Sequence, residues 1–280
     1  MSKSFGLGRP WYAILENPKK QLTETIVHVM ANGGSREIWQ RIDEKQDIRL
    51  LAWPKETAFR VGVIVQGAPQ KELRPATAFP FLEGLPNDMT VQEYQAWPSK
   101  VEGTVAACRN EGANPIRFYT PLLFRDVEAL TEGVRHTFVL AGLALGIRKA
   151  LLDHVDISSG PNYEKYAEQW LAAHPGKSRL DVPQLTLPLR GSRILMPNEY
   201  DCEYQFRAPI SAVDNLEVAG EKIYVLTLEF GLDSDNPLRI AVYAPERICK
   251  DEPKAGMEID GLIWLQGRIM DFDLDNSPLE

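Results

Sequence analysis

The chain has 280 residues, of which 44% are hydrophobic and 25% are charged, a composition that argues against intrinsic disorder and predicts one large or two to three smaller domains. The formal net charge of -8 at pH 7 disfavours non-specific binding of a polyanion, because contacts to phosphates need clustered Lys and Arg. The N-terminus lacks the apolar core of a signal peptide and the longest apolar stretch, Phe138 to Ile147, is too short to span a bilayer, so we expect a cytoplasmic protein without membrane contact.

Residues 1–80 are predicted to form a mixed N-terminal region. The segment 17–34 begins with Asn-Pro and carries apolar residues at helical spacing, which fits an amphipathic helix ended by Gly33-Gly34. The same residues also fit a hairpin, with Asn32-Gly33 as a tight turn into 37–42. We favour the helix. The elements expected after it are a strand over 48–53, a strand over 59–66 and a proline-punctuated boundary over 67–86.

Residues 86–148 are similar to residues 197–269, which indicates an internal repeat. Both segments begin with Pro-Asn and an acidic residue and reach Glu-Tyr-Gln a few residues later. They then carry Asn-Pro, an aliphatic residue and Arg, at Arg117 in the first segment and Arg239 in the second. A glycine lies at nearly the same distance beyond each arginine. Aligning the two segments requires one or two inserted residues after the arginine. We interpret the similarity as duplicated structure rather than chance likeness of two β-rich segments.

The second segment shows the expected fold of one copy most clearly. Alternating apolar residues over 223–228 and 238–242 flank a polar Asp-Ser-Asp-Asn-Pro turn, which predicts a hairpin. A short helix or loop over 245–255 follows, and then a strand over 257–269 that contains glycines. This order of elements is that of a small Greek-key barrel of the oligonucleotide/oligosaccharide-binding (OB) kind. Such a likeness concerns the fold and does not give a function.

Between the two copies lies the clearest predicted helix of the chain. Pro161 or Asn162 opens it and Pro175-Gly176 stops it. We expect this helix to connect the copies and to pack on a barrel. Apolar residues alternate with prolines over 181–197, which predicts an edge strand or an extended linker.

The chain is therefore predicted to be mainly β with some helix (α+β). Its expected architecture is two tandem OB-like small β-barrel modules, related by internal duplication, plus a mixed N-terminal region. The predicted domains are 1–80 (mixed N-terminal region), 81–158 (first barrel-like module), 159–196 (connecting helix and extended linker) and 197–280 (second barrel-like module with an acidic tail).

No local motif predicts catalysis. His154 lies between Asp153 and Asp156, but in a strand the alternation would turn the carboxylates away from the ring, so a solvated charged turn is favoured. Gly6-Leu7-Gly8 lacks the downstream Lys and Ser or Thr of a phosphate-binding loop. We predict no catalytic residue, and we favour a protein without enzymatic activity over an enzyme that has no recognisable local motif.

Metal and cofactor sites are not predicted either. The alternating acids over 271–275 are similar to part of a calcium loop, but Asn276 stands where a Gly is expected and no closing glutamate follows, so an acidic tail is favoured. The three cysteines, Cys108, Cys202 and Cys249, lie far apart and have no ligand spacing. Free thiols in a cytosolic protein are the simplest account. We expect no metal and no cofactor.

Single-stranded nucleic acid is the first alternative ligand. Barrels of this kind bind single strands through aromatic side chains flanked by basic ones, and Phe118 and Tyr119 follow Arg117 and precede Arg125. These four residues are the candidate binding site. Both segments have an arginine at the matching position, Arg117 and Arg239, which also fits a structural role such as closing a turn. The second copy has more acidic than basic residues and would repel phosphate, and the favoured interpretation is that the aromatic side chains fill two cores.

The favoured function is a non-enzymatic binding or scaffold protein that acts through protein–protein interaction, because an acidic surface with aromatic residues and no reactive motif fits an interaction module best. The expected partner is another protein; nucleic acid is disfavoured by the net charge, and no membrane is expected. The alternatives are single-strand nucleic-acid binding through the first barrel module and an enzyme without a recognisable motif. Exposed Phe118 or Tyr119 beside a basic groove would favour nucleic acid, and an exposed apolar patch would favour a protein partner.

Overall fold

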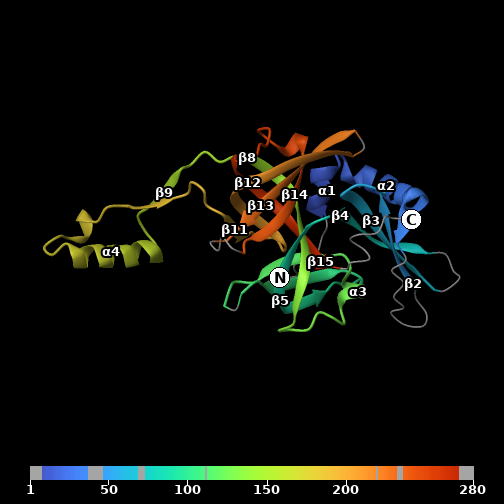
Figure 1. The fold of residues 1–280 in the computed structure, drawn as a ribbon, viewed down its shortest axis with the longest axis horizontal. Coiled ribbons are helices and arrows are strands. Elements are labelled where there is room, and N and C mark those ends of the chain that lie inside the picture. The colour runs from blue at the N-terminus through green and yellow to red at the C-terminus, as the bar shows by residue number, and fades with distance from the viewer. Residues whose placement is uncertain are drawn as a thin grey trace. The chain divides into compact units, whose positions relative to one another are not determined.

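A computed structural model describes residues 8–36, 47–68, 73–110, 112–218, 220–231 and 236–270. The chain divides into two units. Residues 1–149 together with 193–280 form the larger unit, and residues 150–192 form the smaller one. Figure 1 shows the helices and strands of both units.

The N-terminal part of the larger unit is an antiparallel four-stranded sheet, in the order β1-β2-β3-β4, with two helices packed on one face. Because side chains alternate between the faces of a strand, Val61, Val63 and Val65 of β3 pack together with Trp11 of α1 and Val29 of α2. The elements are α1 (Gly8–Ile14), α2 (Pro18–Asn32), β1 (Gly34–Arg36), β2 (Asp47–Trp53), β3 (Phe59–Gly67) and β4 (Arg74–Leu82).

The structure confirms the helix predicted within 17–34. Pro18 is the first residue of α2, where its missing N–H leaves no hydrogen bond unmade, and the N–H of Gly33 donates to the carbonyl of Val29 at 2.7 Å to end the helix. The segment 37–42, the second half of the alternative hairpin, lies outside the described residues. The strands predicted over 48–53 and 59–66 are confirmed as β2 and β3.

A nine-stranded sheet makes up the rest of the larger unit. It begins at Leu85, three residues after the end of β4, so the change between the two sheets falls inside the proline-punctuated stretch of the sequence. The strand order is β11-β12-β13-β14-β8-β15-β7-β6-β5. The elements are β5 (Leu85–Ala96), β6 (Gly103–Cys108), β7 (Ile116–Thr120), α3 (Leu123–Asp126), β8 (Arg135–Lys149), β11 (Ile194–Pro197), β12 (Glu203–Val218), β13 (Glu221–Phe230), β14 (Leu238–Pro245), the 3-10 helix η2 (Glu246–Ile248) and β15 (Glu258–Ile269).

Two additional strand pairings close this sheet into two rings. Pairing of β8 with β5 closes the ring β5-β6-β7-β15-β8, and pairing of β12 with β15 closes the ring β12-β13-β14-β8-β15. The long strands β8 and β15 run antiparallel to each other and belong to both rings. One continuous hydrophobic core lines the two rings, with Phe118 and Phe138 from the first segment and Leu226 and Ile240 from the second.

The mainly β, α+β class is confirmed, but the expectation of two separate tandem barrels needs a correction. Each ring takes one strand from the other segment: β15 pairs with β7 in parallel, and β8 pairs with β14 in parallel. The physical reason is that four strands of one segment leave two unpaired edges, and a fifth strand from the partner segment satisfies them. The duplication itself stays a prediction.

A layer of aromatic side chains joins the four-stranded sheet to the outside of the two rings. Tyr119 of β7 lies 6.0 Å from Phe79 of β4 and 5.1 Å from Trp264 of β15, measured between ring centroids. Tyr243 of β14 lies 5.8 Å from Phe59 of β3. All five side chains are buried in one cluster. The N-terminal sheet therefore covers the outer face of β7, β14 and β15.

The smaller unit consists of a helix on an antiparallel pair of strands. Tyr163 and Ala167 of the helix pack against Val182 in a cluster of their own. The predicted helix is confirmed from Pro161 onward, but it packs within this unit, on its own strand pair, where we expected a barrel to receive it. The elements are β9 (His154–Ile157), α4 (Pro161–Ala173), the 3-10 helix η1 (Arg179–Asp181) and β10 (Leu185–Pro188).

Candidate functional site

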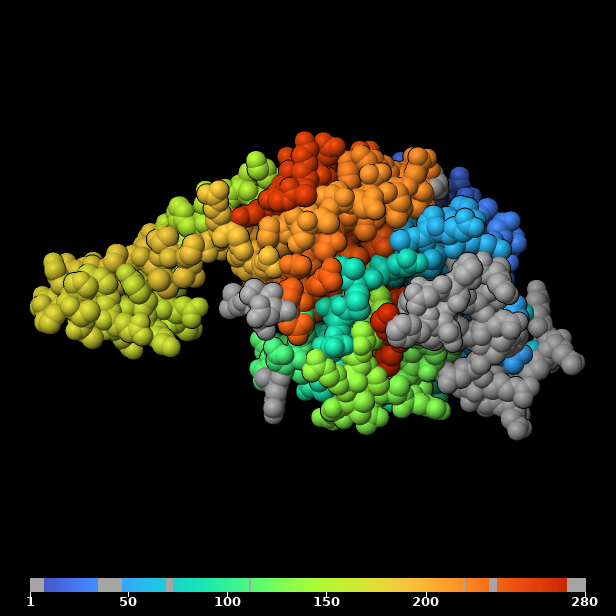
Figure 2. Space-filling model, viewed as in Figure 1, coloured from blue at the N-terminus to red at the C-terminus, as the bar shows by residue number. Residues whose placement is uncertain are grey.

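The larger unit has a groove of about 620 Å³ between its N-terminal part and the second ring. This volume lies within the range of pockets that hold small ligands or peptide side chains. In Figure 2 the surface of the N-terminal sheet (light blue) meets that of β12 and β13 (orange). The lining residues come from α1 and the turn after it, α2, β2, β3, the β12–β13 connection and η2: Ile14, Leu15, Glu16, Gln21, Thr25, Trp53, Phe59, Val61, Val218, Gly220, Glu221, Lys222, Ile223, Glu246 and Arg247.

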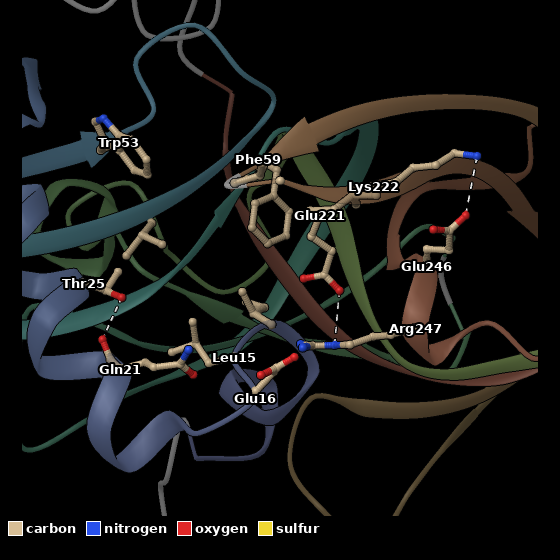
Figure 3. Close-up of a pocket in the computed structure, with 15 residues that line it drawn as sticks. Leu15, Glu16, Gln21, Thr25, Trp53, Phe59, Glu221, Lys222, Glu246 and Arg247 are labelled. Atoms are coloured by element: carbon tan, nitrogen blue, oxygen red, sulfur yellow. Dashed lines mark hydrogen bonds and ion pairs between the residues drawn. The ribbon is translucent and has the colours of Figure 1, made fainter.

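The turn between α1 and α2 shapes one side of the groove. The N–H of Leu15 donates to the carbonyl of Trp11 at 2.7 Å, which closes α1, and Pro18 begins α2 three residues later. The short turn therefore presents Leu15 and Glu16 to the groove (Figure 3). Trp53 adds an aromatic wall, and its ring is held edge-on by the imidazole of His28 at 4.4 Å between centroids.

The other side of the groove is charged. Arg247 of η2 lies with its Nε 3.2 Å from the Glu221 carboxylate and donates a second bond from its guanidinium to the carbonyl of Ala13. Desolvation by burial raises the pKa of Glu221; the charge of Arg247 opposes this rise, and the nearby charge of Glu16 adds to it. These two carboxylates therefore lie within electrostatic reach of each other and of one arginine.

A second charged pair lies at the rim. The Lys222 ammonium donates to the hydroxyl of Tyr224 at 3.0 Å, and this hydroxyl donates to the Glu246 carboxylate at 3.2 Å. Lys222 and Glu246 are themselves 3.7 Å apart. The hydrogen bond to Tyr224 raises the pKa of Lys222, so its charge is retained at neutral pH.

The lining of the groove combines apolar, aromatic and charged side chains. None of the described residues that line it is His, Cys or Ser. No group of three or more His, Cys, Asp or Glu side chains that could hold a metal ion occurs in the part of the chain that the structure describes. What the lining offers is an apolar wall beside fixed charges, which can orient a ligand.

The structure places the predicted aromatic pair inside the protein. Phe118 and Tyr119 are both 0% exposed. Phe118 points into the ring core, 5.2 Å from Phe138 between centroids, and Tyr119 points to the opposite face, where Phe79 covers it. Consecutive residues of a strand face opposite sides, so the side chains of Phe118 and Tyr119 cannot form one surface for stacking nucleic-acid bases. Because both side chains are buried, neither can stack on a base in this fold.

The two predicted arginines are paired with acids. Arg117 forms an ion pair with Glu93, and Arg125 forms one with Asp126 and also donates to the carbonyl of Ile269 at 2.8 Å. A guanidinium that already has a carboxylate partner has less charge to offer to a phosphate. The structure therefore does not bring the four predicted residues together as an exposed basic and aromatic surface.

The main chain of Arg117 and Arg239 has a structural role. The hydroxyl of Tyr204 accepts from the N–H of Arg117 at 2.7 Å and donates to its carbonyl at 3.0 Å. The side chain of Asn87 does the same for Arg239, with both bonds at 2.8 Å. The main chain at each arginine is thus held by a side chain from the first strand of the other segment.

The remaining sequence candidates do not form a site. His154 lies 3.8 Å from the Asp156 carboxylate, and both side chains are exposed. Thr186 of the neighbouring strand β10 donates a hydrogen bond to Asp156. The acidic stretch 271–276 and Gly6-Leu7 lie outside the described residues.

Sequence reasoning did not identify the groove. Its residues come from four stretches of the chain, around positions 15, 53, 221 and 247, and each stretch alone looks like an ordinary helix end, strand or turn. A comparison with protein-family models finds no family that matches, and comparisons with curated proteins and with solved structures find no match. Among the described helices, none is both long and apolar enough to cross a membrane.

Proposed function

We propose that this protein is a non-enzymatic binding or scaffold protein, and that its groove receives a segment of another protein. The observation that carries the proposal is the groove itself: an open, apolar wall with Leu15 and Trp53 beside two fixed ion pairs. Interfaces between proteins combine an apolar centre that contains aromatic side chains with a polar rim, and this arrangement matches them.

Exposed apolar side chains give further support for a protein partner. On α2, the outer face next to the groove carries Val27, with 61% of its surface exposed, beside a shallow hollow of about 470 Å³. The smaller unit also presents large apolar side chains to solvent, and such surface is commonly covered by a partner. The exposed large apolar residues of the smaller unit are Leu151, Leu152, Val155 and Leu180.

Single-stranded nucleic acid is the weaker candidate. The aromatic side chains of its proposed site are buried, and the arginines beside them are neutralised by Glu93 and Asp126. Arg135, another arginine of the first segment, lies 3.9 Å from Asp88. The net charge of -8 also disfavours the contacts that release counterions from a phosphate backbone.

We also propose that the two segments are copies of one OB-like module. In each, the first strand has a bulge, directly after Val91 in β5 and after Ile210 in β12. In each, a glycine with positive φ donates to the carbonyl of that residue: Gly133 to Val91 at 2.9 Å and Gly256 to Ile210 at 2.8 Å. In both segments the N–H of that residue also donates to the carbonyl of the residue after the glycine: Val91 to Val134 at 3.0 Å and Ile210 to Met257 at 2.9 Å. Matching bulges with matching hydrogen bonds support descent from one module more strongly than the sequence similarity does.

The cytoplasm is the location we propose. The cysteines Cys108, Cys202 and Cys249 are all free thiols, which suits a reducing compartment. Burial raises the pKa of the Cys249 thiol to about 11, so at neutral pH it is protonated and unreactive.

The proposed function is tested by affinity capture from the native host with the tagged full-length chain, eluted in rising salt. Protein and nucleic acid are measured in each fraction. Val218→Trp fills the groove, and Val134→Trp adds the same side chain at an exposed position outside it. We expect one protein to be retained in stoichiometric amount by the native chain and by the Val134 variant but lost with the Val218 variant. Capture of nucleic acid alone, or of no macromolecule, would refute the proposal.

A further inference from the structure

The groove has one more negative than positive charge. Its carboxylates are Glu16, Glu221 and Glu246, and its cations are Lys222 and Arg247. Arg247 is already held by Glu221 and by a main-chain carbonyl, and Lys222 is held by Glu246 and a tyrosine hydroxyl. Glu16 has no hydrogen bond or ion pair with any residue that the structure describes. Both cations are therefore committed, and one carboxylate is left for a ligand.

Glu16 is placed where its charge matters. It follows Leu15 directly, so an apolar side chain and an uncompensated carboxylate stand side by side at the mouth of the groove (Figure 3). Figure 3 shows Glu16, Glu221 and Arg247 converging at the same end. The effect of Glu16 on the pKa of Glu221 agrees with this short separation. A cation that enters here would meet the exposed Glu16 carboxylate, the half-buried Glu221 carboxylate and one guanidinium beside an apolar wall.

We propose that the groove binds a basic, apolar segment of a partner protein, with a Lys or Arg side chain directed to Glu16 and a neighbouring aliphatic or aromatic side chain against Leu15 and Trp53. This inference rests on the proposed function and specifies its partner. The long stems of Lys and Arg pack on apolar surface while their charged ends reach a carboxylate. An acidic segment is disfavoured because it would meet the excess negative charge.

The test is a selection of peptides from a library of random eight-residue sequences displayed on phage, using the full-length chain as bait. Peptides retained by the native chain are expected to be enriched in Lys or Arg next to an apolar residue. The affinity of the best peptide is then measured by calorimetry for three chains: native, Glu16→Gln and Glu132→Gln. Glu132 is exposed and lines neither the groove nor the hollow beside Val27, and both variants change the net charge equally.

We expect Glu16→Gln to weaken binding about fivefold at low salt and Glu132→Gln to leave it unchanged. The difference should shrink as salt is added. Peptides without enrichment in basic residues, or equal affinity for both variants, would overturn the inference. If such peptides still compete with the captured protein partner, only the charge preference fails and the proposed function stands. If no peptide is retained and capture from the host also yields no protein, the proposed function fails with it.

Discussion

Glu102 is a carboxylate that the fold removes almost completely from water, with 6% of its surface exposed. It accepts hydrogen bonds from the hydroxyls of Tyr119 at 2.6 Å, Thr77 at 2.9 Å and Ser99 at 3.3 Å. Desolvation by burial raises its pKa above the ordinary value of 4.5, although these bonds lower it. The residue ties β4, the loop before β6, and β7 together at the centre of the aromatic layer.

This raised pKa predicts a specific dependence of stability on pH. The folded state holds the proton of Glu102 more tightly than the unfolded state does. The stability that this protonation contributes is therefore fully present below about pH 4.5 and is lost as the pH rises through the pKa of Glu102 in the folded state. Glu102→Gln removes this titration. We expect the free energy of unfolding of the native chain, measured with urea and compared with that of the variant, to fall between pH 4.5 and 7. A constant difference over this interval would show that Glu102 titrates normally.

Tyr204 provides a second prediction at this scale. Burial raises the pKa of its hydroxyl to about 12, so at neutral pH the group both donates to and accepts from the main chain of Arg117. Tyr204→Phe leaves the half-buried N–H and carbonyl of Arg117 without this partner and should lower the free energy of unfolding by about 2 kcal/mol. Tyr12→Phe, at an exposed tyrosine, is the matched control and should change it by less than about 0.5 kcal/mol.

The predicted aromatic site shows what sequence can and cannot give for single residues. The pattern around Phe118 and Tyr119 correctly indicated a strand, and a strand turns these two side chains to opposite faces. It could not indicate that Phe79, about forty positions earlier, covers the outer face. The assignment of aromatic side chains to cores agrees with their burial, whereas their exposure depends on tertiary packing that no local pattern records.

At the scale of elements, the glycines before β8 and β15 test the proposed repeat. Gly133 and Gly256 have φ angles of 81° and 80°, and no heavy atom lies within 4 Å of where a Cβ would stand. Alanine at either position should therefore cost only backbone strain, about 1 kcal/mol, and nearly the same amount at both. Gly146→Ala is the control, because Gly146 has equal space without a positive φ. Clearly unequal costs at the two positions would argue against their equivalence.

Elements with strong local signals were predicted well. Proline at the start and a glycine or Pro-Gly at the end defined α2 and α4, and strands were predicted where β2 and β3 lie. The strand pair predicted over 223–228 and 238–242 is confirmed as the antiparallel β13 and β14, but the partners of the other strands were not predicted. The pairing of β8 with β15 joins segments more than 100 positions apart, and apolar alternation shows which face of a strand is buried but not which strand lies beside it.

At the scale of the whole molecule, the smaller unit should be dispensable for folding of the larger one. Residues 150–192 leave the sheet after β8 and rejoin it at β11, and β15 and β12 lie between these two strands. The residues paired in succession across the four strands are Arg148, Asp260, Arg207 and Ile194. Three spacings between neighbouring strands separate the two points, which is about 14 Å. A ten-residue Gly/Ser linker spans that distance. We expect the shortened chain to keep its cooperative thermal unfolding, with a free energy changed by less than about 1 kcal/mol. Loss of the cooperative transition would show that the larger unit needs the smaller one.

The central claim is that the groove between the N-terminal part and the second ring is a protein-binding site. Its most direct test is photo-crosslinking in the native host with p-benzoylphenylalanine in place of Thr25, which lines the groove, or of Val134, which is exposed outside it. We predict one discrete protein adduct from position 25 and none from position 134. No protein adduct at position 25, the same adducts at both positions, or an adduct with nucleic acid would contradict the claim.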